Sequence, residues 1–244
     1  MPYTHRYNVV LAVGLVSTAG LGWIVGSWLD GGAAYPLTAA AFFAVLFAAV
    51  VRVAGAHHPY ARFGPANGVT TIRAMLAALA AGLVGHPASP AVLWSVIGLT
   101  ALMAVLDGLD GWLARSTRMA SAYGARFDME TDAAFVLVLS ILVWQHHKAG
   151  VWVLSCGLTR YAFVAAGQIL PWLAEPLRAT RRGRTVAILQ LLGLGVALAP
   201  VVPWPASGVV AGATLAALAW SFAVDVGWLW RQYRMSNPAV HVNR

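Results

Sequence analysis

The chain has 244 residues, of which 60% are hydrophobic and only 10% are charged. A soluble domain carries about 25% charged residues, so this composition excludes a water-soluble globular protein and indicates a membrane protein. The net charge of +8 would point to nucleic acid in a soluble chain, but basic loops on one side of a membrane explain it here, and we expect no nucleic-acid partner. The single cysteine, Cys156, excludes an internal disulfide and a cysteine-based metal site.

Eight apolar segments are long enough to form transmembrane helices. In chain order they are residues 8–29, 35–53, 67–87, 91–114, 123–145, 149–173, 185–202 and 207–230. We therefore predict an all-α integral membrane protein with eight transmembrane helices, in which two N-terminal helices precede a six-helix core. The predicted divisions are 1–55 for the N-terminal pair, 56–66 for a connection along the cytoplasmic interface, 67–232 for the core and 233–244 for a cytoplasmic tail.

The distribution of basic residues predicts the orientation. With the N-terminus in the cytoplasm, thirteen arginines, from Arg6 to Arg244, fall on or near the cytoplasmic side. Only Lys148 falls on the other side, and Arg73 and Arg160 lie within spans. Cytoplasmic loops of membrane proteins carry an excess of Lys and Arg, so both termini are expected to be cytoplasmic.

Acidic residues concentrate around the fourth and fifth spans. Five of the eight Asp and Glu residues of the chain are Asp107, Asp110, Asp128, Glu130 and Asp132. Steps of three and four residues place one stripe at the end of the fourth span, formed by Asp107, Asp110, Gly111 and Ala114. A second stripe starts the fifth span and contains Gly124, Asp128 and Asp132. A short connection makes these helices antiparallel, so four carboxylates should face one gap.

The cost of burying charge indicates what fills this gap. An aspartate at the centre of a membrane helix costs about 2.5–3.5 kcal/mol, and four facing lipid would cost roughly 10 kcal/mol. The carboxylates should therefore line a wet cavity and be neutralised by Arg115 and Arg126 or by divalent metal. Ligands that are all oxygen suit Mg²⁺ or Mn²⁺, and two such ions could clamp a diphosphate. The small residues on the stripes leave room for a flat group, which favours a nucleotide over a transported ion.

These residues resemble the signature of the CDP-alcohol phosphotransferase (CDP-alcohol phosphatidyltransferase) family. The matching pattern is Asp107-x-x-Asp110-Gly111-x-x-Ala114-Arg115, eight residues, Gly124, three residues, Asp128, three residues, Asp132. A second element, Asn67-x-x-Thr70-x-x-Arg73, opens the third span, as in members with phosphorylated acceptors. The usual proline before the asparagine is Ala66 here, with Pro65 one residue earlier. The resemblance covers about residues 60–232.

The resemblance implies a membrane enzyme of phospholipid biosynthesis with a six-helix core, generally homodimeric. An acceptor hydroxyl attacks the β-phosphorus of a CDP-linked alcohol, most often CDP-diacylglycerol, and releases CMP. It implies two divalent ions, Mg²⁺ or Mn²⁺. With the orientation from the basic residues, we expect a cytoplasmic active site in the bacterial inner (plasma) membrane. The implied metal ligands are Asp107, Asp110, Asp128 and Asp132, and Asp132 is also the implied general base. The implied CDP-binding residues are Asn67, Thr70, Asp110, Gly111, Ala114, Arg115 and Gly124.

The acceptor is less well defined by the sequence. Three basic residues are candidates to bind it: Arg73, Arg118 and Arg160. Arg73 and Arg160 lie within spans, where an arginine either pairs with a buried acid or binds a substrate group, and both interpretations stay open. We favour glycerol 3-phosphate or another phosphorylated polyol. The alternatives are choline, serine or inositol as acceptor, a divalent-cation transporter, or a family member that acts only as a scaffold.

For three further sets of residues we expect a structural role or leave the role open. Glu130 lies off the second aspartate stripe, so we expect it to support the site rather than bind metal. Asp225 has no evident partner in the sequence, and either an arginine or dimer packing could satisfy it. The pairs His57–His58 and His146–His147 point to different faces of any helix, so we expect interfacial loop residues rather than metal ligands.

Overall fold

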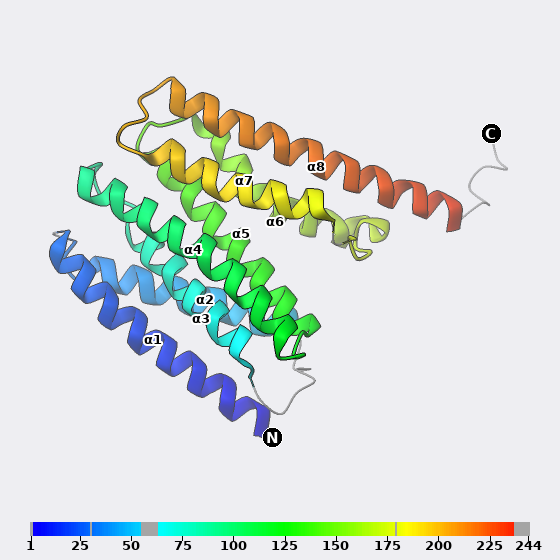
Figure 1. The fold of residues 1–244 in the computed structure, drawn as a ribbon, viewed down its shortest axis with the longest axis horizontal. Coiled ribbons are helices and arrows are strands. Elements are labelled where there is room, and N and C mark those ends of the chain that lie inside the picture. Colours follow the sequence, from blue (N-terminus) through cyan, green and yellow to red (C-terminus); the bar gives the residue numbers. More distant parts are fainter. Residues whose placement is uncertain (1, 30, 55–62, 179, 237–244) are drawn as a thin grey trace.

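The computed structural model describes residues 2–29, 31–54, 63–178 and 180–236 (Figure 1). These residues are helical and contain no strand, as the sequence predicts. Most of the predicted connection 56–66, with His57–His58, and most of the tail 233–244 lie outside the described residues. The elements are α1 (Pro2–Trp28), α2 (Ala34–Ala54), α3 (Pro65–Gly82), α4 (Pro90–Ser116), α5 (Ala122–Gln145), η1 (Val151–Val153), α6 (Leu154–Ile169), η2 (Pro171–Leu173), α7 (Arg181–Leu198) and α8 (Ala206–Ser236).

Hydroxyl side chains determine where three of the helices begin. Ser89 Oγ accepts a hydrogen bond from the Val92 amide at the start of α4 (3.2 Å). Ser121 starts α5 and Thr180 starts α7 in the same way. Such side chains satisfy amides that have no partner within the helix. The Thr180 cap explains why α7 begins at residue 181, four residues before the predicted span.

The helices run up and down, so that the connections gather at two ends of the molecule (Figure 1). The α4–α5 connection lies at the same end as the start of α7 and the C-terminal end of α8. Helix α3 packs against α2, α4 and α5, and α7 packs against α4, α5 and α8. Helices α4 and α5 therefore lie between the N-terminal helices and the C-terminal pair, and their connected ends carry the aspartates.

Four helices in the described residues are long and apolar enough to cross a membrane: α1, α2, α4 and α8. Large apolar side chains on them are exposed, including Val45, Val105 and Val209, as expected for a surface covered by lipid. Helices α3, α6 and α7 are shorter, and α5 carries Asp128, Glu130 and Asp132. Helix α6 has 16 residues, below the ~20 that a perpendicular span requires. The protein is an integral membrane protein, and the number of helices that cross the bilayer stays a prediction.

The N-terminal helices pack directly on α3 and α5. The hydroxyl of Tyr35 on α2 donates a hydrogen bond to the Leu79 carbonyl of α3 (2.6 Å). Phe43 and Phe47 of α2 are buried in a cluster with Phe127, and the Phe47 and Phe127 rings meet edge to face at 6.2 Å between centroids. Phe127 immediately precedes Asp128, so α2 supports the turn of α5 that carries this aspartate.

Helices α5 and α6 approach closely at Gly157. A Cβ atom built on Gly157 would lie 2.4 Å from the Cα atom of Leu137, which is backbone of α5. Gly157→Ala should therefore force the two helices apart and destabilise the protein by about 1–3 kcal/mol. Thermal unfolding in detergent micelles would measure this loss.

Gly98→Ala on α4 is the matched control, because nothing lies within 4 Å of the Cβ position at Gly98. The control should gain about 0.5–1 kcal/mol from the higher helix propensity of alanine. Equal unfolding temperatures for the two variants would contradict the close approach of α5 and α6.

Candidate active site

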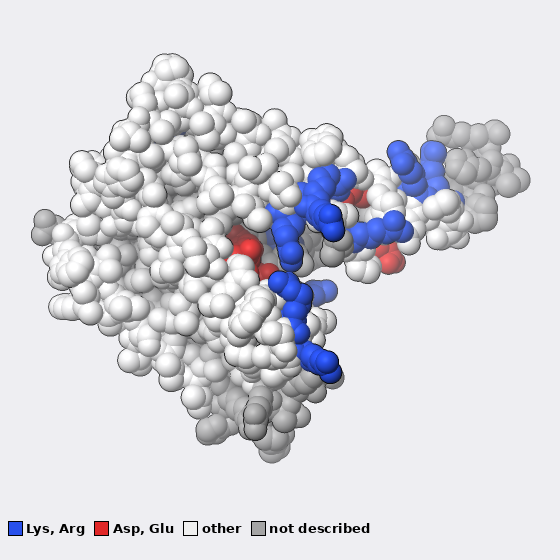
Figure 2. Space-filling model, viewed as in Figure 1, with Lys and Arg blue, Asp and Glu red and all other residues white. Residues whose placement is uncertain are grey.

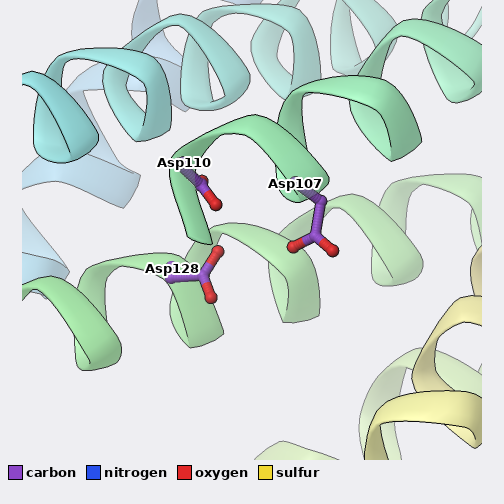
Figure 3. A group of neighbouring side chains, drawn as sticks. All are labelled: Asp107, Asp110 and Asp128. Atoms are coloured by element: carbon purple, nitrogen blue, oxygen red, sulfur yellow. The ribbon is translucent and has the colours of Figure 1, made fainter. Parts of the chain in front are cut away.

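Two helices bring the aspartates together. Asp107 and Asp110 lie near the C-terminal end of α4, and Asp128 and Asp132 lie near the start of α5. Figure 3 shows the carboxylates of Asp107, Asp110 and Asp128 turned toward the same space between the two helices. One oxygen from each of these three residues lies within 4.8 Å of the others, which is close enough to hold one metal ion.

Arg73 of α3 lies at the centre of this cluster. Its guanidinium forms ion pairs with all four aspartates: Asp110 and Asp128 through Nη1, Asp132 through Nη2, and Asp107 at 3.0 Å. Its side chain is only 1% exposed. Of the two expected sources of positive charge, Arg115 with Arg126 or divalent metal, the arginine pair is wrong, because Arg73 lies among the carboxylates and the other two side chains are exposed.

The spacing on α3 accounts for the position of Arg73. Steps of three residues place Asn67, Thr70 and Arg73 on one face of α3, which packs against α4 and α5. Thr70 Oγ1 donates to Asp110 Oδ2 at 3.3 Å and lies 3.1 Å from the Ala66 carbonyl oxygen. The motif that opens α3 therefore meets the aspartates directly.

The cluster is open on one side. The Asp110 side chain is 7% exposed, whereas those of Asp107, Asp128 and Asp132 are 33%, 39% and 36% exposed. Asp110 thus forms the floor, and the other three carboxylates line the opening. Figure 2 shows acidic side chains in a hollow of the surface, with Lys and Arg side chains beside it. A negatively charged group with bound cations could enter from this side.

The glycines of the signature lie where other groups approach closely. A Cβ atom at Gly124 would lie 2.8 Å from Asn67 Oδ1, so this glycine allows the start of α5 to meet α3. A Cβ atom at Gly111 would lie 3.2 Å from an Nη atom of Arg115, so this arginine lies over Gly111. Ala114 follows one turn after Gly111 and is half-buried. Asn67 and Thr70 are buried beside Asp110 and Gly124, so most of the predicted CDP-binding residues lie around one hollow.

The other two candidate acceptor residues lie on α6 and in the α4–α5 connection. Arg160 of α6 forms an ion pair with Glu130 of α5, which gives each of these half-buried side chains a structural partner. Arg118 is exposed in the α4–α5 connection, where its φ of 55° lies in the left-handed region that often ends a helix. Arg73 therefore pairs with the four aspartates, whereas Arg160 pairs with Glu130.

The structure supplies a partner for Asp225 of α8, which pairs with Arg182 of α7. Nearby arginines lie over aromatic rings, with Arg178 4.2 Å from the centroid of Trp228. At the opposite end of the bundle, Lys148 Nζ donates to the carbonyl oxygens of Ala199 and Val202 at 2.9 and 2.7 Å. His146 and His147 follow α5 at that end, away from the aspartates.

The sequence model of the CDP-alcohol phosphatidyltransferase family matches residues 63–224, about two thirds of the chain. The chain belongs to this family. Comparison with curated proteins and with solved structures gives no match. The matched range contains all four aspartates and Arg73, and it excludes α1 and α2.

Membership identifies the protein as a transferase of phospholipid synthesis that uses a CDP-alcohol, in a family whose members use divalent metal. The carboxylates of the cluster fit such a metal. Asp107, Asp110 and Asp128 offer only carboxylate oxygens, the ligands that Mg²⁺ and Mn²⁺ prefer. Their proximity in the described residues is consistent with at least one ion.

Proposed function

We propose that the protein transfers a phosphatidyl group from CDP-diacylglycerol to the hydroxyl of a phosphorylated polyol, such as glycerol 3-phosphate, and releases CMP. The observation that carries this proposal is the group of four carboxylates from α4 and α5 around one open hollow, within a chain of this family. The proposed cofactor is two Mg²⁺ or Mn²⁺ ions. Their ligands would be Asp107, Asp110, Asp128 and Asp132.

The nucleotide would occupy the part of the hollow next to α3. The proposed CDP-binding residues, by family resemblance, are Asn67, Thr70, Asp110, Gly111, Ala114, Arg115 and Gly124. Support comes from the contacts of Thr70 with Asp110 and from the approach of Asn67 to Gly124. When bound, the divalent cations would neutralise the diphosphate and polarise its P–O bonds.

The reaction breaks one P–O bond and forms another. The acceptor oxygen bonds to the β-phosphorus, the bond from this phosphorus to the CMP oxygen breaks, and CMP leaves with that oxygen. Asp132 would take the proton of the attacking hydroxyl, since its carboxylate lies at the open side of the cluster. Most of the rate should come from positioning and electrostatic stabilisation, as in phosphoryl transfer generally.

The acceptor would bind through the arginines near the hollow. The candidates are Arg73 within the cluster, Arg160 beside Glu130, and Arg118 in the α4–α5 connection. The basic side chains beside the acidic hollow (Figure 2) would favour an acceptor with its own phosphate over choline, serine or inositol. We further propose eight transmembrane helices, a homodimer, and a cytoplasmic active site in the bacterial inner membrane. The basic residues near the aspartate end and Lys148 at the other end support this orientation.

Release of CMP tests the proposed reaction. Purified protein is incubated with labelled CDP-diacylglycerol, Mg²⁺ and one acceptor at a time: glycerol 3-phosphate, inositol phosphate, glycerol, inositol, serine or choline. We expect CMP and a new labelled lipid with a phosphorylated polyol, and neither product when EDTA is present. Folded protein that releases no CMP with any acceptor would overturn the proposal. Release with an unphosphorylated acceptor alone would keep the reaction and change the acceptor class.

A divalent-cation transporter would also place carboxylates in a membrane. It would move Mn²⁺ across a vesicle membrane without nucleotide, and family membership gives it no support. Mn²⁺ flux into proteoliposomes, measured without CDP-lipid, separates the two functions.

A further inference from the structure

One arginine faces four carboxylates in the buried part of the site. The formal charges of the four carboxylates and the single guanidinium of Arg73 sum to −3. The guanidinium is almost fully buried, and its Nε atom has no hydrogen-bond partner among the described residues. Arg73 thus neutralises the four carboxylates only in part, and its Nε–H donor makes no hydrogen bond among the described residues.

The same three carboxylates would have to serve two kinds of cation. Asp107 Oδ1, Asp110 Oδ2 and Asp128 Oδ1 contact Arg73. These three residues also offer the oxygens that lie within 4.8 Å of one another and could hold a metal ion. A divalent cation among them would lie close to the guanidinium and would be repelled by it. Arginine and metal therefore compete for this space.

We propose that Arg73 is the counter-cation of the metal-free aspartate cluster and that it lowers the affinity of the cluster for divalent cations. It keeps four carboxylates from repelling one another before metal binds, and it must give up part of its contacts when metal enters. Arg73 is a positioning residue in this role, because it acts through the aspartates. This inference rests on the proposed function for the metal site, but its test needs no lipid and no turnover.

The test measures Mn²⁺ binding to wild-type protein and to Arg73→Gln in detergent, by calorimetry and by the electron paramagnetic resonance signal of free Mn²⁺. We expect the dissociation constant of Arg73→Gln to be at least tenfold lower than that of the wild type. Without metal, the variant should unfold at a lower temperature, and Mn²⁺ should raise that temperature more than in the wild type. A residue with only a structural role would weaken Mn²⁺ binding when removed.

Two further variants complete the test. Arg73→Lys keeps one positive charge but cannot contact four carboxylates at once, so its Mn²⁺ affinity should lie between those of wild type and Arg73→Gln. Arg182→Gln breaks the half-buried pair with Asp225 and should leave Mn²⁺ affinity unchanged. Equal or weaker Mn²⁺ binding by Arg73→Gln would overturn the proposal. If Arg73→Gln cannot be purified with or without Mn²⁺, equal affinities of Arg73→Lys and wild type would overturn it.

These outcomes are distinguishable from a failure of the proposed function. Wild-type protein that binds Mn²⁺ but releases no CMP from any CDP-lipid would remove the transferase proposal and leave the role of Arg73 intact. CMP release by the wild type, together with unchanged Mn²⁺ binding by Arg73→Gln, would do the reverse.

Discussion

Asp132→Asn is expected to lower kcat for CMP release by about 10²–10⁴-fold, the range typical of a lost general base. Asparagine has nearly the same shape as aspartate but cannot accept the proton of the acceptor hydroxyl. The Asp132 side chain is 36% exposed at the open side of the cluster, where an acceptor could reach it. The loss should persist at saturating CDP-diacylglycerol and acceptor, because it concerns the chemical step. Initial rates of labelled CMP release would measure it.

Asp225→Asn is the matched control for this experiment. Asp225 is also a half-buried aspartate paired with an arginine, but its partner is Arg182 and it lies outside the cluster. Its kcat should stay close to that of the wild type, and unfolding temperatures should show that both variants are folded. A folded Asp132→Asn protein with an undiminished kcat would rule out Asp132 as the base.

Phe47→Ala is expected to destabilise the protein by about 3–5 kcal/mol, the usual cost of emptying the space of a buried phenylalanine. Phe47 is 2% exposed, and its ring packs on the rings of Phe43 and Phe127. Lipid cannot easily fill a gap between α2 and α5, so the lost packing should not be recovered. Because Phe127 adjoins Asp128, CMP release should fall as well. Thermal unfolding and initial rates would measure the two effects.

Val45→Ala provides the comparison on the same helix. Val45 is 70% exposed on the apolar surface, so its loss should change the unfolding temperature little. The N-terminal helices lie outside the range matched by the family, and this comparison tests whether they support the site. Equal stability and equal activity of the two variants would show that α2 does not support α5.

The helices could be predicted well from the sequence because long apolar segments and Gly and Pro residues mark them. Their ends were less predictable. Helix α3 ends at Gly82, whereas the sequence predicted a span that continues to residue 87. The predicted span 149–173 consists of α6 with a short 3-10 helix on each side. Hydropathy indicates roughly how long an apolar segment is, whereas hydrogen bonds and turns determine the residue at which a helix ends.

The aspartate cluster was predictable because regular spacing places polar residues on one helix face. Pairing of Arg73 with a buried acid was one of two interpretations that the sequence left open, but its four aspartate partners were not identified, although Thr70 and Arg73 share a face of α3. Spacing identifies residues that share a face, but it does not show which face of a third helix meets the other two. Spacing could not identify the partner of Asp225 either, because Arg182 lies 43 residues away in the chain on another helix.

The central claim is that Asp107, Asp110 and Asp128 bind divalent cations between α4 and α5. Anomalous diffraction from crystals grown with Mn²⁺ and a CDP-alcohol tests it most directly. We expect anomalous peaks between these helices, within coordination distance of the three carboxylates, with the diphosphate beside them. A bound CDP-alcohol with no anomalous peak at these carboxylates would contradict it.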